Sequence, residues 1–120
     1  MRREADARDR WLAAVGSIPG TLVYRSEVLR GIGHAISLPV GHPDCVWVGG
    51  GVAVWVEWKA PGGRLRPEQA AFRRALEAAG GHWLLARDPA SCCDMLADLV
   101  QDPVRSALLE AGRNLREGAK

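Results

Sequence analysis

Apolar and polar positions along the chain follow two periods, one typical of strands and the other typical of helices. Short apolar runs bounded by glycine or proline predict four strands, at 21–25, 45–48, 52–58 and 82–86. Apolar residues three or four positions apart predict four helices, at 3–15, 67–79, 89–100 and 103–116. The order of these elements predicts a mixed α/β fold, in which the second helix crosses between two parallel strands.

Glycine and proline mark the boundaries of several elements. Pro67 suits the first position of a helix, and Gly80-Gly81 ends the same helix. Between 26 and 43, glycines and prolines interrupt every regular pattern, which predicts a long loop. The last helix has an apolar face that either packs on its own domain or forms a dimer interface, and the small size of the chain favours the interface. This face consists of Val104, Leu108, Ala111 and Leu115.

Composition adds few constraints. The chain has 120 residues, 48% of them hydrophobic and 25% charged, which predicts a single domain with one core. A net charge of +2 is too small to indicate nucleic-acid binding by itself. The sequence has no long apolar segment and a charged N-terminus, so we expect a cytoplasmic protein without a membrane span or signal peptide. Three cysteines without disulfide or zinc spacing are expected to be buried thiols: Cys45, Cys92 and Cys93.

Lysine is nearly absent from the chain, and this makes Lys59 the first candidate for chemistry. Fourteen of the sixteen basic residues are arginine, and Lys59 is the one lysine before the C-terminal residue. A lysine offers a compact point charge that the planar guanidinium of arginine does not replace. Glu57 shares the strand face of Lys59, and Pro43-Asp44 precedes the neighbouring strand. Asp44, Glu57 and Lys59 would be the minimum set for metal-assisted cleavage of a phosphodiester.

The loop at glycines 49–51 decides whether Asp44 lies beside Glu57. An even loop of two or four residues places Asp44 on the Glu57 face, directly opposite it in the four-residue case. An unbulged three-residue loop sends Asp44 to the other face. If the carboxylates converge, their repulsion raises a pKa unless a cation lies between them, and hard oxygen ligands suit Mg²⁺ or Mn²⁺. Lys59 would then orient a water or stabilise charge developing on phosphorus.

Other polar residues surround this set. Gln69 lies on the inward face of its helix, three residues before Phe72, and therefore needs a polar partner. The sheet face is one candidate, and a phosphate oxygen is another. His42 is close to Asp44 in sequence, but a loop histidine is more often structural. Three arginines near the site are candidates for phosphate contacts: Arg64, Arg66 and Arg73.

Together these residues resemble the VRR-NUC branch of the PD-(D/E)XK nucleases. The resemblance covers residues 41–87, about the central half of the chain, and its strongest part follows the Glu-x-Lys pair. The motif residues are Asp44, Glu57-x-Lys59 and Pro61-Gly62-Gly63-Arg64-Leu65-x-Pro67-Glu68-Gln69. The resemblance implies a restriction-endonuclease-like fold, with a central mixed four-stranded sheet flanked by helices, and metal-dependent DNA cleavage.

The resemblance also implies roles for individual residues. Asp44 and Glu57 would bind the metal together with the backbone carbonyl of Trp58, Lys59 would be the catalytic lysine, and Gln69 would complete the site. The family has a glutamate on the first helix, for which Glu4 is the first candidate and Asp6 and Asp9 stay open. Arg66 departs from the family, because many members have a helix-capping serine or threonine there.

We therefore expect a Mg²⁺- or Mn²⁺-dependent DNA endonuclease in a bacterial or phage-infected cell. Family members without further domains are frequent in phages and resemble homodimers that cut four-way (Holliday) junctions or other branched DNA. A two-fold dimer suits such substrates because it places two active sites on two strands. One alternative is a catalytically silent DNA-binding or scaffold domain with the same fold. Another is a site-specific restriction enzyme, for which 120 residues leave little room for base-reading elements.

Overall fold

The computed structural model describes residues 3–26 and 39–118. The long loop predicted for 26–43 therefore lies mostly outside the described residues. The elements are α1 (Arg3–Val15), β1 (Thr21–Arg25), β2 (Cys45–Gly49), β3 (Val52–Trp58), α3 (Pro67–Ala78), β4 (His82–Ala86), α4 (Pro89–Ala97) and α5 (Val104–Gly118). None of the helices within these ranges has the length and apolar content needed to cross a bilayer.

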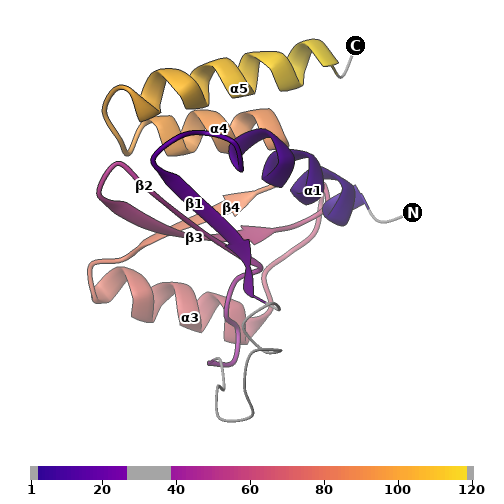
Figure 1. Cartoon of the computed structure of the whole chain (residues 1–120). Coiled ribbons are helices and arrows are strands. Elements are labelled where there is room, and N and C mark those ends of the chain that lie inside the picture. Colours follow the sequence, from indigo (N-terminus) through magenta and orange to yellow (C-terminus); the bar gives the residue numbers. More distant parts are fainter. Residues whose placement is uncertain (1–2, 27–38, 119–120) are drawn as a thin grey trace.

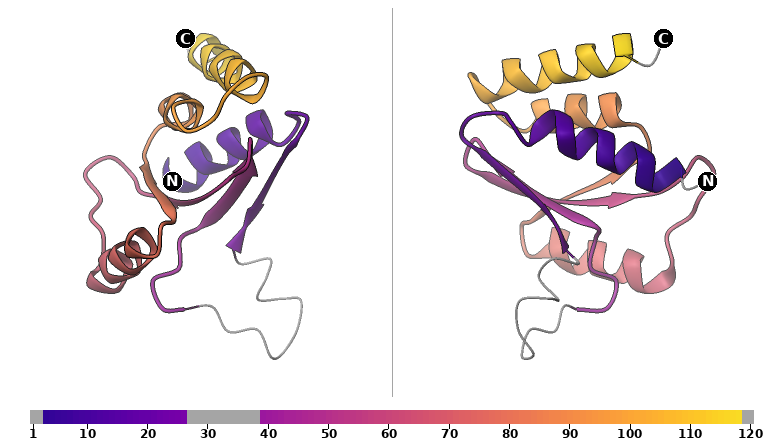
Figure 2. Two further views of the ribbon diagram at one scale, coloured as in Figure 1. Left: turned by 90° about the vertical axis from the view of Figure 1, so that its left-hand side faces the viewer. Right: turned by 45° about the vertical axis from the view of Figure 1, so that its right-hand side comes forward.

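The four strands form one sheet in the order β1-β2-β3-β4. β1 and β2 are antiparallel, as are β2 and β3, whereas β3 and β4 are parallel and are connected by α3. Figure 1 shows α1, α4 and α5 on one face of this sheet and α3 on the other, and the turned views in Figure 2 show the same arrangement. The predicted mixed α/β fold is confirmed, and this architecture is consistent with a restriction-endonuclease-like fold.

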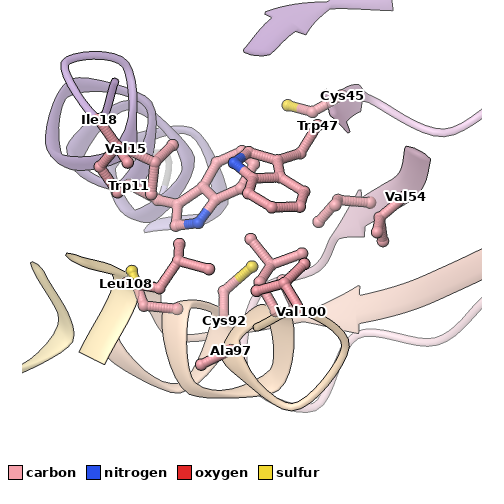
Figure 3. Packing of buried hydrophobic residues seen from close by; sticks show 14 of the residues in the cluster. Trp11, Val15, Ile18, Cys45, Trp47, Val54, Cys92, Ala97, Val100 and Leu108 are labelled. Atoms are coloured by element: carbon pink, nitrogen blue, oxygen red, sulfur yellow. The ribbon is translucent and has the colours of Figure 1, made fainter. Parts of the chain in front are cut away.

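Large aromatic side chains fill the space between the sheet and α1, α4 and α5 (Figure 3). Trp11 of α1 lies against Trp58 of β3 with ring centroids 5.5 Å apart, and both side chains are fully buried. Trp47 of β2 is also fully buried. All three cysteines are buried and unpaired, as expected. The core face of the sheet is therefore closed to solvent near the middle of β2 and β3.

Trp55 differs from this pattern, because its side chain is only half-buried. Strand alternation places Trp55 on the face of α3, and its neighbour in the register is Trp83 of β4, which is buried. Helix α3 packs on β4, so it covers Trp83 more completely than Trp55.

The apolar face of α5 packs inside the molecule. Val104, Leu108 and Gly112 are buried, and Ala111 and Leu115 lie against the core. Helix α5 contacts α4 along much of its length, and α4 in turn covers the sheet (Figure 1). The stripe that we expected to form a dimer interface is thus used for packing within the chain.

Helix α4 is shorter than predicted. It ends at Ala97, whereas the sequence pattern extended it to 100. The N–H groups of Leu99 and Val100 bond to carbonyls three residues earlier, so the chain tightens and leaves the α-helix there. The Val100 side chain then packs beside the glycine turn between β2 and β3.

Candidate active site

The turn between β2 and β3 sets the position of Asp44. It has two residues, Gly50 and Gly51, with φ values of +59° and +82°, which a residue with a side chain rarely adopts. A Cβ on Gly50 would also lie 2.9 Å from the Val100 side chain. Gly49 pairs with Val52, so the third glycine belongs to the strand rather than to the turn.

This register brings the two acids together. Cys45 pairs with Val56, so one position further along the hairpin Asp44 faces Glu57. The expectation that an even loop places both acids on one face is confirmed. We had expected direct opposition from a four-residue loop, but a two-residue turn produces the same register because Gly49 is paired.

Backbone groups hold Asp44 at the start of β2. The Trp58 N–H donates to Asp44 Oδ2 at 2.9 Å, and the Ser26 N–H donates to the Asp44 carbonyl at 2.8 Å. The Ser26 hydroxyl also donates to the carbonyl of Pro43 at 2.6 Å. The carboxylate therefore has a partner from β3, and the Asp44 backbone has one from Ser26, which directly follows β1. The contribution of Ser26 was not foreseen from the sequence.

Glu57 is a buried acid with only 2% of its surface exposed. Gln69 Nε2 donates to Glu57 Oε2 at 3.3 Å, and Lys59 Nζ lies 3.7 Å from the same oxygen. Gln69 Oε1 accepts the Arg66 N–H at 2.9 Å, at the beginning of α3. The inward-facing glutamine thus has its expected partner on the sheet, and its carbonyl oxygen also satisfies the N–H of the N-cap residue Arg66, as the N3 residue of a capping box does.

The environment of Glu57 favours its neutral form. Burial raises the pKa of Glu57 from 4.5 to about 8, and the nearby negative charge of Asp44 adds to this effect. The ammonium group of Lys59 opposes the shift without cancelling it. The pair of acids consequently has a deficit of positive charge, which is the condition under which a bound cation is most strongly stabilising.

Of the three acids on the first helix, Glu4 is the one whose charge acts on the pair of Asp44 and Glu57. Its negative charge contributes to the raised pKa of Glu57. Glu4 is half-buried, whereas Asp6 and Asp9 are exposed, and Asp9 pairs with Arg8 at 3.3 Å. These observations favour Glu4 among the three candidates.

His42 supports the loop before Asp44. Its Nδ1 lies 2.9 Å from the Pro43 carbonyl, which can only accept, so Nδ1 carries the proton. The imidazole packs edge-on against Phe72 of α3 with centroids 5.3 Å apart. Gly41 has φ +84°, and a Cβ there would lie 2.1 Å from the Glu68 carbonyl oxygen. Gly41 and His42 therefore pack directly on the first turns of α3.

The three predicted phosphate-binding arginines differ in their surroundings. Arg73 lies over the Trp83 ring at 4.5 Å and pairs with Glu77, so it contributes to the packing of α3 on β4. Arg66 pairs with Glu68 at 3.0 Å. Arg64 is exposed and forms no ion pair with any residue that the structure describes. Arg64 is thus the most available of the three.

A further arginine, Arg87, was missed by the sequence analysis. It follows β4, and its Nη1 donates to the carbonyl of Ala60 at 2.8 Å. This bond ties the loop after Lys59 to the end of the parallel strand. Its partner is a backbone oxygen far away in sequence, so no local pattern could have indicated it.

A hard divalent ion fits the donor set of this site. The described residues contain no group of three His, Cys, Asp or Glu side chains suited to a metal, so Asp44 and Glu57 would be the side-chain ligands. Mg²⁺ commonly binds through one or two carboxylates and retains several waters. The two juxtaposed acids, one of them buried and short of positive charge, meet this requirement. The role of the Trp58 carbonyl stays a prediction.

Comparison with known proteins identifies no relative: no family model matches the chain, and no curated protein is similar to it in sequence. The resemblance to the VRR-NUC nucleases therefore depends on the motif residues between 41 and 87, and it stays a prediction.

Proposed function

We propose that this chain is a Mg²⁺- or Mn²⁺-dependent endonuclease that hydrolyses phosphodiester bonds in DNA. The convergence of Asp44, Glu57 and Lys59 at one end of the β2–β3 hairpin carries the proposal. Two acids and an ammonium group on adjacent strands suit this chemistry. The acids can bind a metal ion, and the metal ion and the ammonium group together can stabilise the negative charge of the phosphodiester.

Each residue has a distinct task in this proposal. Asp44 and Glu57 would hold the ion, which would supply polarisation of the scissile phosphate and a lower pKa of a bound water. The Lys59 side chain is 14% exposed and its Nζ lies 3.7 Å from Glu57 Oε2, so its ammonium group would donate to the attacking water or to a phosphate oxygen. Gln69 fixes the orientation of the Glu57 carboxylate from α3.

The loop between β3 and α3 is the proposed contact for the DNA backbone. Arg64 and Arg66 lie on this loop, directly after Lys59. Contacts to phosphates position a nuclease without reading sequence, which agrees with a substrate recognised by its shape. Branched DNA as the substrate and a homodimer as the active form are parts of the proposal that rest on the family resemblance.

The test uses labelled four-way junction, flap, linear duplex and single-stranded DNA, each with Mg²⁺, Mn²⁺ or a chelator. We expect cleavage that requires metal and that falls by roughly 10²–10³-fold in Lys59→Ala, since one group that stabilises developing charge commonly contributes this much. Arg105→Ala is the matched control, because Arg105 is exposed on α5, away from the site. Full cleavage by the Lys59 variant would refute the role assigned to this lysine.

The alternative is a catalytically silent DNA-binding or scaffold domain with the same fold. That alternative predicts salt-sensitive DNA binding without cleavage under any metal. It also predicts equal DNA affinity with Mn²⁺ and with chelator. The same set of reactions, combined with a binding assay, therefore separates the two functions.

A further inference from the structure

Asp44 lies just outside the regular part of the sheet. The ladder between β2 and β3 begins at Cys45 and Val56, so Asp44 precedes the first paired residue of its strand. A proline stands before it and has no N–H to contribute to a ladder. Strand pairing with β3 therefore does not by itself fix the peptide that carries the Asp44 side chain.

Ser26 supplies the missing constraint from the other side. It follows β1, whose last pair is Arg25 with Cys45, so Ser26 faces Asp44. Its N–H donates to the Asp44 carbonyl at 2.8 Å and its hydroxyl donates to the Pro43 carbonyl at 2.6 Å. The hydroxyl bond holds the Pro43–Asp44 peptide and the N–H bond holds the Asp44–Cys45 peptide, so the backbone on both sides of the Asp44 Cα is fixed. Rotation of either peptide would swing the Asp44 carboxylate away from Glu57.

The hydroxyl of Ser26 is buried and hydrogen-bonded rather than exposed at the surface. Ser26 is 5% exposed, and its hydroxyl bond spans 17 residues of sequence. The Pro43 carbonyl that receives it also accepts the His42 Nδ1–H. Carbonyls accept two hydrogen bonds, so the Ser26 and His42 donors together saturate this one and hold it in a single orientation.

We propose that Ser26 is a positioning residue for the metal site, which holds the Pro43–Asp44 peptide so that the Asp44 carboxylate faces Glu57. The inference rests on the proposed function, because it concerns the metal ligand named there. Groups that orient a metal ligand from outside the coordination sphere typically change metal affinity by 10–100-fold when removed. Ser26 touches neither the ion nor the substrate, so its effect should appear in metal affinity rather than in the chemical step.

The experiment measures Mn²⁺ binding by titration calorimetry in the wild type, Ser26→Ala and Ser26→Thr. Ser106→Ala is the control, because it also removes a serine hydroxyl that donates a hydrogen bond. The acceptor in this case is the carboxylate of Asp102, just before α5. We expect Mn²⁺ binding to be roughly tenfold weaker in Ser26→Ala than in the wild type. In Ser26→Thr, which keeps a hydroxyl, the Mn²⁺ affinity should return partly or fully to the wild-type value, and in Ser106→Ala it should not change. Cleavage should show the same shift in the Mn²⁺ concentration needed for half-maximal rate, with little change of kcat at saturating Mn²⁺.

Urea unfolding in chelator separates positioning from folding. Wild-type Mn²⁺ affinity in Ser26→Ala, with or without a loss of stability, would overturn the inference while leaving the nuclease proposal intact. If Ser26→Ala does not fold, Ser26→Cys replaces it, because it keeps the size of the side chain and exchanges a strong donor for a weak one. Wild-type affinity in the cysteine variant would then overturn the inference. Absence of Mn²⁺ uptake by the wild type would instead refute the proposed function and the inference with it.

Discussion

On one face of the sheet the buried side chains are tryptophan, valine and cysteine, whereas the face that carries α3 buries a carboxylate and an amide beside apolar side chains such as Trp83. The first face is covered by α1, α4 and α5, and the second is covered by α3 near β4 (Figure 2). On the first face, the apolar side chains become more stable as they leave water. On the second, Glu57 becomes less stable as an anion, and its burial is compensated only in part by Lys59 and Gln69.

Stability and chemistry are located on different faces of the sheet. The packed face stabilises the fold and contains no group that needs a ligand. The other face contains two acids whose mutual repulsion lowers the stability of the metal-free fold. A cation would relieve this repulsion, so the same feature that destabilises the site favours metal binding. Substitutions on the two faces should therefore change stability in opposite directions.

Trp47 tests the packed face and should give the largest effect. Trp47→Ala removes a fully buried aromatic side chain, which we expect to lower the free energy of unfolding by about 3–5 kcal/mol. Urea unfolding in chelator measures it. Trp47→Phe is the control, because the Trp47 indole N–H has no hydrogen-bond partner among the described residues and little beyond ring volume is lost. A loss in Trp47→Ala below 1 kcal/mol would show that this face is not the main source of stability.

Glu57 tests the other face. In the folded protein its pKa is about 8, compared with 4.5 for an unperturbed carboxyl. Between these values the folded state retains a proton that the unfolded chain releases, so the stability of the metal-free wild type falls as the pH rises from about 4.5 to 8. The slope approaches about 1.4 kcal/mol per pH unit in the middle of this range and vanishes outside it.

Glu57→Gln removes this titration. We expect the variant to be more stable than the metal-free wild type at pH 8, with a smaller difference at pH 5. Adding Mn²⁺ should stabilise the wild type and leave the variant nearly unchanged, because binding to the folded state alone shifts the unfolding equilibrium. Urea titrations at both pH values, with chelator and with Mn²⁺, provide all four comparisons. Equal pH dependence in the two proteins would contradict the buried-acid interpretation.

The ends of the strands could be predicted from the sequence, but the register of the hairpin that forms the site could not. Alternating apolar runs with glycine boundaries predicted β1, β3 and β4 with their observed ends, because strand periodicity and turn chemistry are local properties. The register of the hairpin could not be predicted, because three consecutive glycines permit several turns. The contact of Gly50 with Val100, which is distant in sequence, accompanies the observed turn.

The site residues divide in the same way. Glu57 and Lys59 were predicted from their spacing on one strand, and Gln69 from its inward position on α3. Ser26 and Arg87 were missed because each bonds a backbone carbonyl distant in sequence, for which the sequence has no signal. The different roles of Arg64 and Arg73 also required the structure, since only the fold places Trp83 under one of them.

Gln69 connects α3 to the buried acid on the same face of the sheet. Gln69→Ala removes the donor to Glu57 and the acceptor for the Arg66 N–H, and we expect a loss of about 1 kcal/mol in stability. Mn²⁺ affinity should fall by roughly tenfold, as for other groups that orient metal ligands. Gln101→Ala, at an exposed position, is the control. Unchanged Mn²⁺ affinity, measured by calorimetry, would limit Gln69 to a helix-capping role.

The smallest effects are expected for Arg64 and Arg73, and they should differ between these two arginines. Arg64→Ala is expected to lower DNA affinity and to reduce the slope of log affinity against log salt by about one, because one phosphate contact is lost. Arg73→Ala should leave this slope unchanged and lower stability by about 0.5–1 kcal/mol, because its guanidinium lies over Trp83 and pairs with Glu77. Fluorescence anisotropy over a series of salt concentrations, in chelator to prevent cleavage, measures the first effect, and urea unfolding measures the second. Equal salt slopes for both variants would mean that DNA approaches the site from another direction than the loop after Lys59.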